Sequence, residues 1–332
     1  MHAVALTRGL PIDDEQSLVD AELPDPTPGP RDVLVEVRAA SVNPVDVKQR
    51  AASPELAEPR VLGFDGAGVV RAVGSEVTLF AQGDEVWWAG QLDRQGSDAD
   101  LQLVDERIVG RKPSSLSFAE AAALPLTAIT AWESLFDKLG LTETSEGSLL
   151  VVGATGGVGS IMLQLVRELV PGMRTVATAS NDDNERWVRS LGASAAVDHH
   201  ADLVAQTLEA EPDGVDWIFS AHSAGRAADY AHMLRPFGAV VAIDSAKDVD
   251  LDALKPKSQS WHWELMFTRP MQRTPDMIRQ HELLDAVADL VDVGRVTSTV
   301  QTILSGWDAA TFREAHRFVE SGRTVGKVVV QR

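Results

Sequence analysis

A glycine-rich run is the segment whose residue types point most directly to chemistry. It reads Gly153-Ala154-Thr155-Gly156-Gly157-Val158-Gly159 and follows the apolar run 148–152. A dinucleotide pyrophosphate needs a tight turn, a position without a side chain where the backbone approaches phosphate, and a small residue where helix packs on strand. In the G-x-G-x-x-G spacing Ala154 replaces the first glycine, so the match alone is weak. It is supported by its context, because a predicted strand precedes the run and a predicted helix follows it. We expect a dinucleotide here, the alternative being a turn without a nucleotide.

The residues after the next predicted strand, 175–179, bear on which dinucleotide binds. An acidic residue there would hold the ribose hydroxyls of NAD, whereas its absence leaves room for a 2′-phosphate. The strand ends instead in Ser180 and Asn181, and Arg186 follows. We therefore expect NADPH, with Arg186 near the phosphate. NADH stays open, because the aspartates at 182–183 would repel a phosphate and Arg186 has the alternative of being a solvated helix charge.

The composition excludes several kinds of site. The 332 residues contain no cysteine, which rules out disulfides, thiolate nucleophiles, iron–sulfur clusters and cysteine-based zinc sites. The 30 lysines and arginines against 49 aspartates and glutamates give a net charge of −19, the opposite of what a nucleic-acid binder needs. No apolar stretch approaches a membrane span, and the N-terminus lacks the apolar part of a signal peptide. We expect a cytoplasmic protein without nucleic-acid or membrane partners.

The chain changes its pattern near residue 117. Before it, short apolar runs at 33–38, 66–73 and 84–88 are separated by glycine-containing turns. This pattern is typical of a small barrel-like β domain.

From Ser117 onward the pattern predicts helices and buried strands. Ser117, with Glu120 three residues later, forms a capping box, and Pro125 marks a break between two helices. The run 148–152 shows no alternation, as expected of a strand buried on both faces. Apolar strands then alternate with amphipathic helices, which predicts a parallel doubly wound sheet. Helices are expected over 157–168, 184–191 and 224–234, and strands over 175–178, 217–219 and 239–243.

Several segments resemble the medium-chain dehydrogenase/reductase superfamily, and the resemblance covers essentially the whole chain. Residues 39–46, 63–70 and 124–128 look like its quinone-oxidoreductase branch, and residues 104–113, 261–269 and 322–327 look like the bacterial zinc-type alcohol dehydrogenase-like proteins.

This resemblance implies an α/β protein with a GroES-like β-barrel catalytic domain over 1–122 and 272–332 and a Rossmann NADP-binding domain over 123–271. It also implies a homodimer, since relatives commonly pair their Rossmann sheets edge to edge.

Zinc is not expected. The resemblance places the catalytic cysteine of zinc-dependent members at Asn43, their His-Glu pair at Phe64-Asp65, and a four-cysteine lobe near residues 90–110. A catalytic zinc needs about three protein ligands, and Asp65 alone does not provide them. The eight histidines are scattered, and the adjacent pair His199-His200 is expected on the surface, away from the cleft.

The resemblance also assigns candidate catalytic residues. Asn43 would lie at the cleft floor near nicotinamide and substrate, Asp46 belongs to the same turn, and Thr127 would approach the nicotinamide. Lys48 stands where related reductases carry a tyrosine, so it is the candidate proton donor. The alternatives are a turn-forming role for Asn43 and a solvated surface charge for Lys48.

Cofactor contacts are expected along the Rossmann domain and at two further positions. Side chains that follow parallel strands meet at the carboxyl edge of the sheet, and the resemblance adds Phe267 and Lys327. For Phe267 the alternative is core packing, and for Lys327 it is a surface ion pair. The expected set is Ala154, Thr155, Gly156, Gly157, Val158, Gly159, Ser180, Asn181, Arg186, Ser220, Ala221, His222, Asp244, Ser245, Phe267 and Lys327.

Without a metal to stabilise an alkoxide, acceptors that take hydride readily are favoured over simple alcohols. We therefore expect a zinc-independent NADPH-dependent reductase of a small quinone or α,β-unsaturated carbonyl. An enoyl-thioester reductase or an alcohol dehydrogenase-like enzyme is one alternative. An NADPH-binding structural or sensor protein with little turnover is another.

Overall fold

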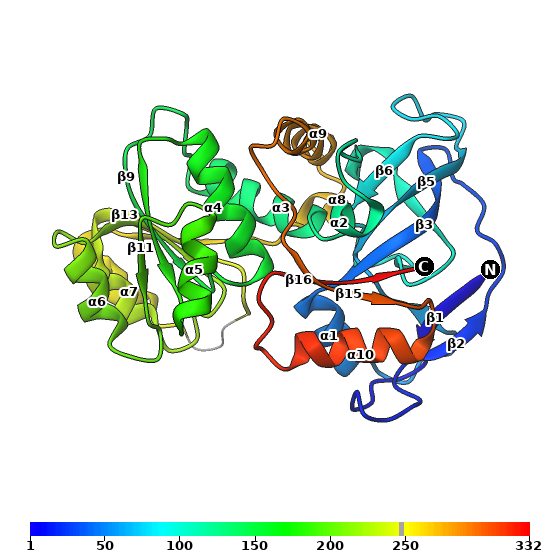
Figure 1. Ribbon diagram of the computed structural model, residues 1–332, viewed down its shortest axis with the longest axis horizontal. Helices are drawn as coiled ribbons and strands as arrows, with labels where there is room; N and C mark the ends of the chain where they lie inside the picture. Colours follow the sequence, from blue (N-terminus) through cyan, green and yellow to red (C-terminus); the bar gives the residue numbers. More distant parts are fainter. Residues whose placement is uncertain (246–248) are drawn as a thin grey trace. The chain divides into compact units, whose positions relative to one another are not determined.

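The computed structural model describes residues 1–245 and 249–332, and the chain separates into two compact units (Figure 1). Unit 1 comprises Met1–Ile129 and Phe267–Arg332, and unit 2 comprises Thr130–Met266. The sequence placed the passages between domains at 122/123 and 271/272. Helix α3 (Pro125–Trp132) runs through the first passage, so no change of composition marks it.

Unit 1 is built on a seven-stranded sheet in which β15, β16, β3, β5, β6 and β8 follow one another and β7 pairs with β3. In β3 the residues Val33, Val35 and Val37 alternate with partly exposed neighbours and are fully buried. The runs predicted as strands over 33–38 and 66–73 fall within β3 and β5, and the run 84–88 begins one residue before β6. The strands of this sheet are β3 (Asp32–Val42), β5 (Asp65–Val73), β6 (Glu85–Trp88), β7 (Leu101–Asp105), β8 (Val109–Arg111), β15 (Val300–Ser305) and β16 (Lys327–Gln331).

A smaller sheet and short helices complete unit 1. The predicted capping box is confirmed: Ser117 N donates to Glu120 Oε2 at 2.9 Å, and Glu120 N donates to Ser117 Oγ at 3.3 Å. The break before Pro125 separates α2 from α3. The small sheet has β2 (Val19–Glu22), β1 (His2–Leu6) and β4 (Arg60–Val61), and the helices include α1 (Pro44–Ala51), α2 (Phe118–Ala122), α8 (Thr268–Gln272), α9 (Arg279–Asp292) and α10 (Ala309–Glu320).

Unit 2 contains the predicted parallel sheet, with strand order β11-β10-β9-β12-β13-β14. Two of its strands and one helix were not predicted. Strands β11 and β14 have three and four residues, which is too few for a periodic signal. The strands are β9 (Gly147–Val152), β10 (Met173–Thr178), β11 (Ala195–Val197), β12 (Val215–Ser220), β13 (Leu234–Ala242) and β14 (Ser260–Trp263), and the missed helix is α6 (Leu203–Ala210).

Helices cover both faces of this sheet. Helices α4 (Gly157–Leu169) and α5 (Asp182–Ser190) lie on one face, and α6 and α7 (Ala227–Met233) lie on the other (Figure 1). Right-handed crossovers impose this, because the strand order runs from β9 to β11 and then returns to β12. The strand order reverses beside β9, and sheets of this type bind ligands at the carboxyl ends of the strands next to such a reversal. Within the described residues no helix is long and apolar enough to cross a membrane.

Candidate active site

The glycine-rich turn leaves β9 at the carboxyl edge of the parallel sheet. Gly153 has a φ of 85°, a left-handed conformation that favours glycine. The left-handed residue of the turn is therefore Gly153, and position 154 can be an alanine. A Cβ on Gly159 would lie 2.4 Å from Ala154 Cα, so α4 packs on the turn only because this residue is glycine. A Cβ on Gly156 would meet only the Gly153 carbonyl oxygen, at 3.4 Å, so the space beside Gly156 is open. These features fit a dinucleotide pyrophosphate.

The turn is held from β10. The buried Thr178 hydroxyl accepts a hydrogen bond from Gly153 N at 2.9 Å, and Gly156 stands at the start of α4, where free backbone N–H groups favour an anion. Thr178 was not singled out from the sequence, because only the pairing of β10 with β9 brings it to the turn.

The tip of β10 carries the predicted polar residues. Ser180 Oγ accepts from Asn184 Nδ2 at 2.9 Å, and Asn181 Oδ1 accepts from Asn184 N at 2.9 Å, which caps α5. Arg186 is largely exposed and ion-paired with Asp183. A 2′-phosphate would therefore have to compete with Asp183 for the guanidinium.

Polar groups also follow β12 and β13. Ser220 Oγ lies 2.8 Å from the Tyr230 hydroxyl, which donates to the His222 carbonyl at 3.0 Å. Burial raises the pKa of Tyr230 to about 12, so this hydroxyl stays neutral and acts structurally. Asp244 accepts from Ser223 N at 2.8 Å and from Ser223 Oγ at 2.5 Å, which ties the ends of the two strands together.

The other expected residues at this edge differ in their surroundings. Ala221 N donates to the Val152 carbonyl at 3.2 Å, whereas Ser245 is exposed. His200 is exposed as predicted, but His199 is half-buried. Burial lowers the pKa of His199, with smaller contributions from His200 and His222. His199 is therefore less exposed than the sequence predicted, whereas its distance from the cleft stays a prediction.

A buried polar cluster in unit 1 links segments that are far apart in sequence. Asn43, which is 2% exposed, donates through Nδ2 to Asp65 Oδ2 at 2.8 Å and to the Ser41 carbonyl at 3.2 Å. Lys327 donates through Nζ to Asn43 Oδ1 at 2.5 Å and to Asp65 Oδ2 at 3.1 Å. Leu126 N donates to Asp65 Oδ1 at 2.7 Å. Asp65 thus joins the turn before α1, the first turn of α3 and the start of β16.

Asp46 extends this cluster in the first turn of α1. Its carboxylate accepts from Asn43 N at 2.8 Å and from Gly63 N at 3.0 Å. Burial raises the pKa of Asp46 to about 7, although these N–H groups and the Lys327 charge oppose the shift. Burial, and then Asp46, also raise the pKa of the nearby Asp98 well above its usual range. One of these two carboxyl groups therefore keeps a proton under mildly acidic conditions.

The remaining predicted residues of unit 1 differ in burial. Thr127 is 2% exposed and donates through Oγ1 to the Leu124 carbonyl at 2.9 Å. Phe267 is buried, with its ring 5.2 Å from that of Phe64 in an edge-to-face contact. Lys48 is exposed on α1. The structure thus brings Asn43, Asp46 and Lys327 together. Thr127 directly follows Leu126, whose N–H group donates to Asp65. The structure leaves Lys48 at the surface.

A second acidic pair lies in unit 2. Glu264 follows β14, and its side chain is 1% exposed and 3.5 Å from Lys138 Nζ. Burial raises the pKa of Glu264 to about 9, and a hydrogen bond and the charge of Glu133 add to the shift. Glu133 begins a π-helical segment, Glu133–Lys138, that continues α3. The two carboxyl groups therefore hold a proton at neutral pH.

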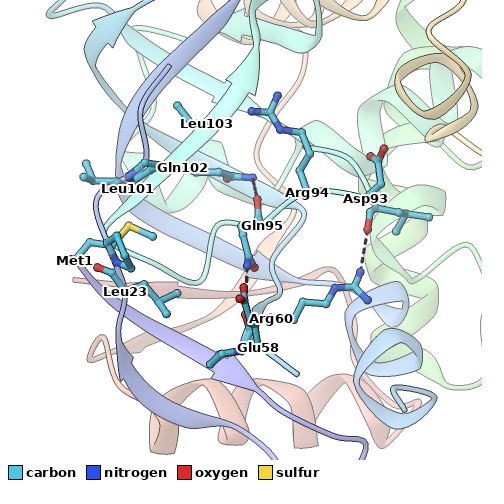
Figure 2. Close-up of a pocket in the computed structure, with 14 residues that line it drawn as sticks. Met1, Leu23, Glu58, Arg60, Asp93, Arg94, Gln95, Leu101, Gln102 and Leu103 are labelled. Carbon is cyan, nitrogen blue, oxygen red and sulfur yellow. Dashed lines mark hydrogen bonds between the residues drawn. The ribbon is translucent and has the colours of Figure 1, made fainter. Parts of the chain in front are cut away.

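A groove in unit 1 has a volume of about 690 Å³. Figure 2 shows the side chains that line it. Its two arginines are anchored by neighbours: Arg60 donates to the Leu92 carbonyl at 2.9 Å, and Arg94 donates to Asp32 at 2.7 Å. None of the site residues predicted from the sequence is among those that line it. The groove is therefore separate from the buried cluster.

The comparisons with known proteins agree with this architecture. Residues 29–131 match the family described as alcohol dehydrogenase GroES-like domain, and residues 191–330 match zinc-binding dehydrogenase. The chain is 40% identical over 311 residues to a zinc-type alcohol dehydrogenase-like protein of Staphylococcus aureus, which covers 92% of each protein. The chain belongs to the medium-chain dehydrogenase/reductase superfamily.

Two further members are similar to this medium-chain dehydrogenase/reductase. A solved structure from Rhizobium etli, described as a zinc-dependent alcohol dehydrogenase protein, has a TM-score of 0.96 at 46% identity and covers 100% of this chain and 98% of its own. The 2-methylene-furan-3-one reductase of Solanum lycopersicum is 37% identical over 225 residues, covering 64% of this chain and 55% of that protein. The predicted family and fold are confirmed, and the chain is an oxidoreductase that uses a nicotinamide cofactor.

Because these family names mention zinc, the donor groups of this medium-chain dehydrogenase/reductase decide whether a catalytic zinc fits. At the positions where the resemblance places zinc ligands, Asn43 Oδ1 and Asp65 Oδ2 both accept from the Lys327 ammonium, and Phe64 has no ligand atom. Among the described residues, no three His, Cys, Asp or Glu side chains are grouped to hold a metal ion. This donor set does not fit a catalytic zinc.

Proposed function

We propose that this protein is a zinc-independent, NADPH-preferring reductase of quinones or α,β-unsaturated carbonyls. The observation that carries the proposal is the Lys327 ammonium bound to Asn43 and Asp65, because a group of this kind cannot polarise an alkoxide as a metal does. Acceptors that accept hydride without a Lewis acid are then the best substrates. The name of the Solanum lycopersicum relative, a reductase of a conjugated enone, supports the same substrate class.

The preference for NADPH is supported by the tip of β10, where Ser180 and Asn181 stand in place of an acidic residue. The pyrophosphate would bind at Gly156 and the start of α4, and bound NADPH supplies the hydride.

The catalytic roles are proposed from burial and hydrogen bonds. Both N–H groups of the Asn43 amide are engaged, which fixes its orientation, and Asp46 holds the backbone of the same turn. Thr127 has a hydroxyl whose proton is directed to Leu124, so its oxygen is left to accept. Lys48, exposed to solvent, would deliver the proton that completes the reduction.

A homodimer in the cytoplasm is part of the proposal. The support is the edge strand β14, where Trp263 and the following Leu265 are 49% and 51% exposed. An unpaired strand edge with apolar neighbours is a ready surface for a second copy.

The test is steady-state oxidation of NADPH by chelator-treated protein with 9,10-phenanthrenequinone and with 2-cyclohexenone, beside NADH under identical conditions. We expect turnover that survives chelation and prefers NADPH. Activity lost on chelation and restored by zinc would overturn the metal-free mechanism. Tight NADPH binding without turnover of either acceptor would instead favour a binding role.

A further inference from the structure

The Lys327 side chain is surrounded by oxygen acceptors in the interior of unit 1. Its Nζ contacts Asn43 Oδ1 at 2.5 Å, Asp65 Oδ2 at 3.1 Å and the Val42 carbonyl at 3.3 Å. An ammonium has three N–H donors, so each has an acceptor. Lys327 is 4% exposed, and Asp65 is fully buried. The ammonium is therefore fixed in place.

The charges around Asp65 need this cation. Unpaired burial of a carboxylate is costly, and the buried Asp46 and Asp98 lie in the same region. Asp65 also accepts a hydrogen bond from Leu126 N at 2.7 Å. The ammonium of Lys327 balances the charge of Asp65 from a distance of 3.1 Å.

A divalent cation would compete for the same two oxygens. Zinc binds carboxylate oxygen at about 2.0–2.2 Å, so an ion held by Asp65 and Asn43 would lie against the Lys327 ammonium. Such an ion could enter only if the Lys327 side chain moved away from both oxygens.

We propose that Lys327 takes the place of the catalytic metal as a permanent internal cation that positions Asn43 and, through Asp65, the first turn of α3. Lys327 fixes which end of the Asn43 amide faces Asp65, because the ammonium can bond only to the amide oxygen. Asp65 then holds Leu126, the neighbour of Thr127. Lys327 is thus a positioning residue, and no contact of its own with substrate is required.

The test compares Lys327→Met, Lys327→Arg, Asp65→Asn and the double variant Lys327→Met/Asp65→Asn. Lys327→Met leaves Asp65 buried without its cation, so we expect the melting temperature to fall by roughly 10 °C. The double variant removes both charges and should regain most of this loss. If Lys327→Met does not fold, the double variant is compared with Asp65→Asn, which leaves the ammonium without its carboxylate; the double variant should then melt at the higher temperature, and a lower one would overturn the ion pair. If the fall in melting temperature of the double variant equals the sum of the falls of the two single variants, the proposed ion pair between Lys327 and Asp65 is overturned.

Turnover separates positioning from charge balance. The double variant lacks the ammonium that selects the orientation of the Asn43 amide, so we expect kcat to stay at least tenfold low after stability has returned, while Lys327→Arg regains part of it. Recovery of kcat together with stability would mean that Lys327 only neutralises Asp65, and would overturn the positioning role. This readout rests on the proposed reductase activity, whereas the melting temperatures do not.

Metal content gives a readout that is independent of activity. After chelation, incubation with zinc and dialysis, the wild-type protein should retain no stoichiometric zinc, and one zinc per chain would refute the proposal.

Lys112→Met is the matched control for the Lys327 variants, because Lys112 is also a buried lysine, 5% exposed, that donates to the Pro113 and Leu116 carbonyls. It should lower the melting temperature and leave kcat unchanged.

Discussion

Gly156 and Gly159 lie in the same turn, and alanine should have a different effect at each. At Gly159 the new Cβ would lie 2.4 Å from Ala154 Cα and 2.6 Å from the Gly153 carbonyl oxygen, whereas ordinary contacts begin at 3.4 Å. Helix α4 or the turn must therefore move by about 1 Å, and overpacking of this kind costs about 2 kcal/mol. We expect Gly159→Ala to lower the melting temperature by roughly 5 °C.

At Gly156 the new Cβ meets only the Gly153 carbonyl oxygen, at 3.4 Å, and the φ of −73° suits any residue. Gly156→Ala should therefore leave the melting temperature within about 1–2 °C of the wild type. If the pyrophosphate approaches this backbone, the methyl group removes a charge-assisted hydrogen bond worth about 1.5–3 kcal/mol. NADPH should then bind roughly 10- to 100-fold more weakly.

The assay is titration of the fluorescence of NADPH, with thermal unfolding of the same samples. Gly159→Ala serves as the control for general damage to the turn, since its main effect should be a lower melting temperature. The reasoning about the turn is refuted if Gly156→Ala binds NADPH as tightly as the wild type. It is equally refuted if Gly159→Ala is as stable as the wild type.

Two further predictions concern cofactor choice and pH. Ser180→Asp places a carboxylate at the tip of β10 and should weaken NADPH binding at least tenfold relative to NADH, measured as the ratio of kcat/KM, and an unchanged ratio would locate the 2′-phosphate elsewhere. Burial raises the pKa of Glu264 from 4.5 to about 9, so the folded chain keeps a proton that the unfolded chain releases, and stability falls as pH rises across that window. In urea unfolding between pH 5.5 and 8.5, Glu264→Gln should remove up to about 1.4 kcal/mol of this fall per pH unit, and equal slopes in both proteins would contradict it.

The local pattern of the sequence predicted the elements that carry the cofactor turn. A strand buried on both faces, a glycine-rich run and an amphipathic helix are recognisable because each depends on neighbours within a few residues. The capping box at Ser117 and Glu120 is predictable for the same reason, since both partners lie in one turn of helix. Short elements such as β11 escaped, because three residues carry no periodicity.

The tertiary structure alone decided the environment of the buried cluster. Asn43 and Asp65 are separated from Lys327 by most of the chain, and only the pairing of β16 with β3 and of β3 with β5 brings them together. The sequence left Lys327 between a cofactor contact and a surface ion pair, and burial made its partner an interior carboxylate. The residue types thus determined which charges the chain carries. The long-range strand pairings determined which charges meet away from water, where their interaction is strongest.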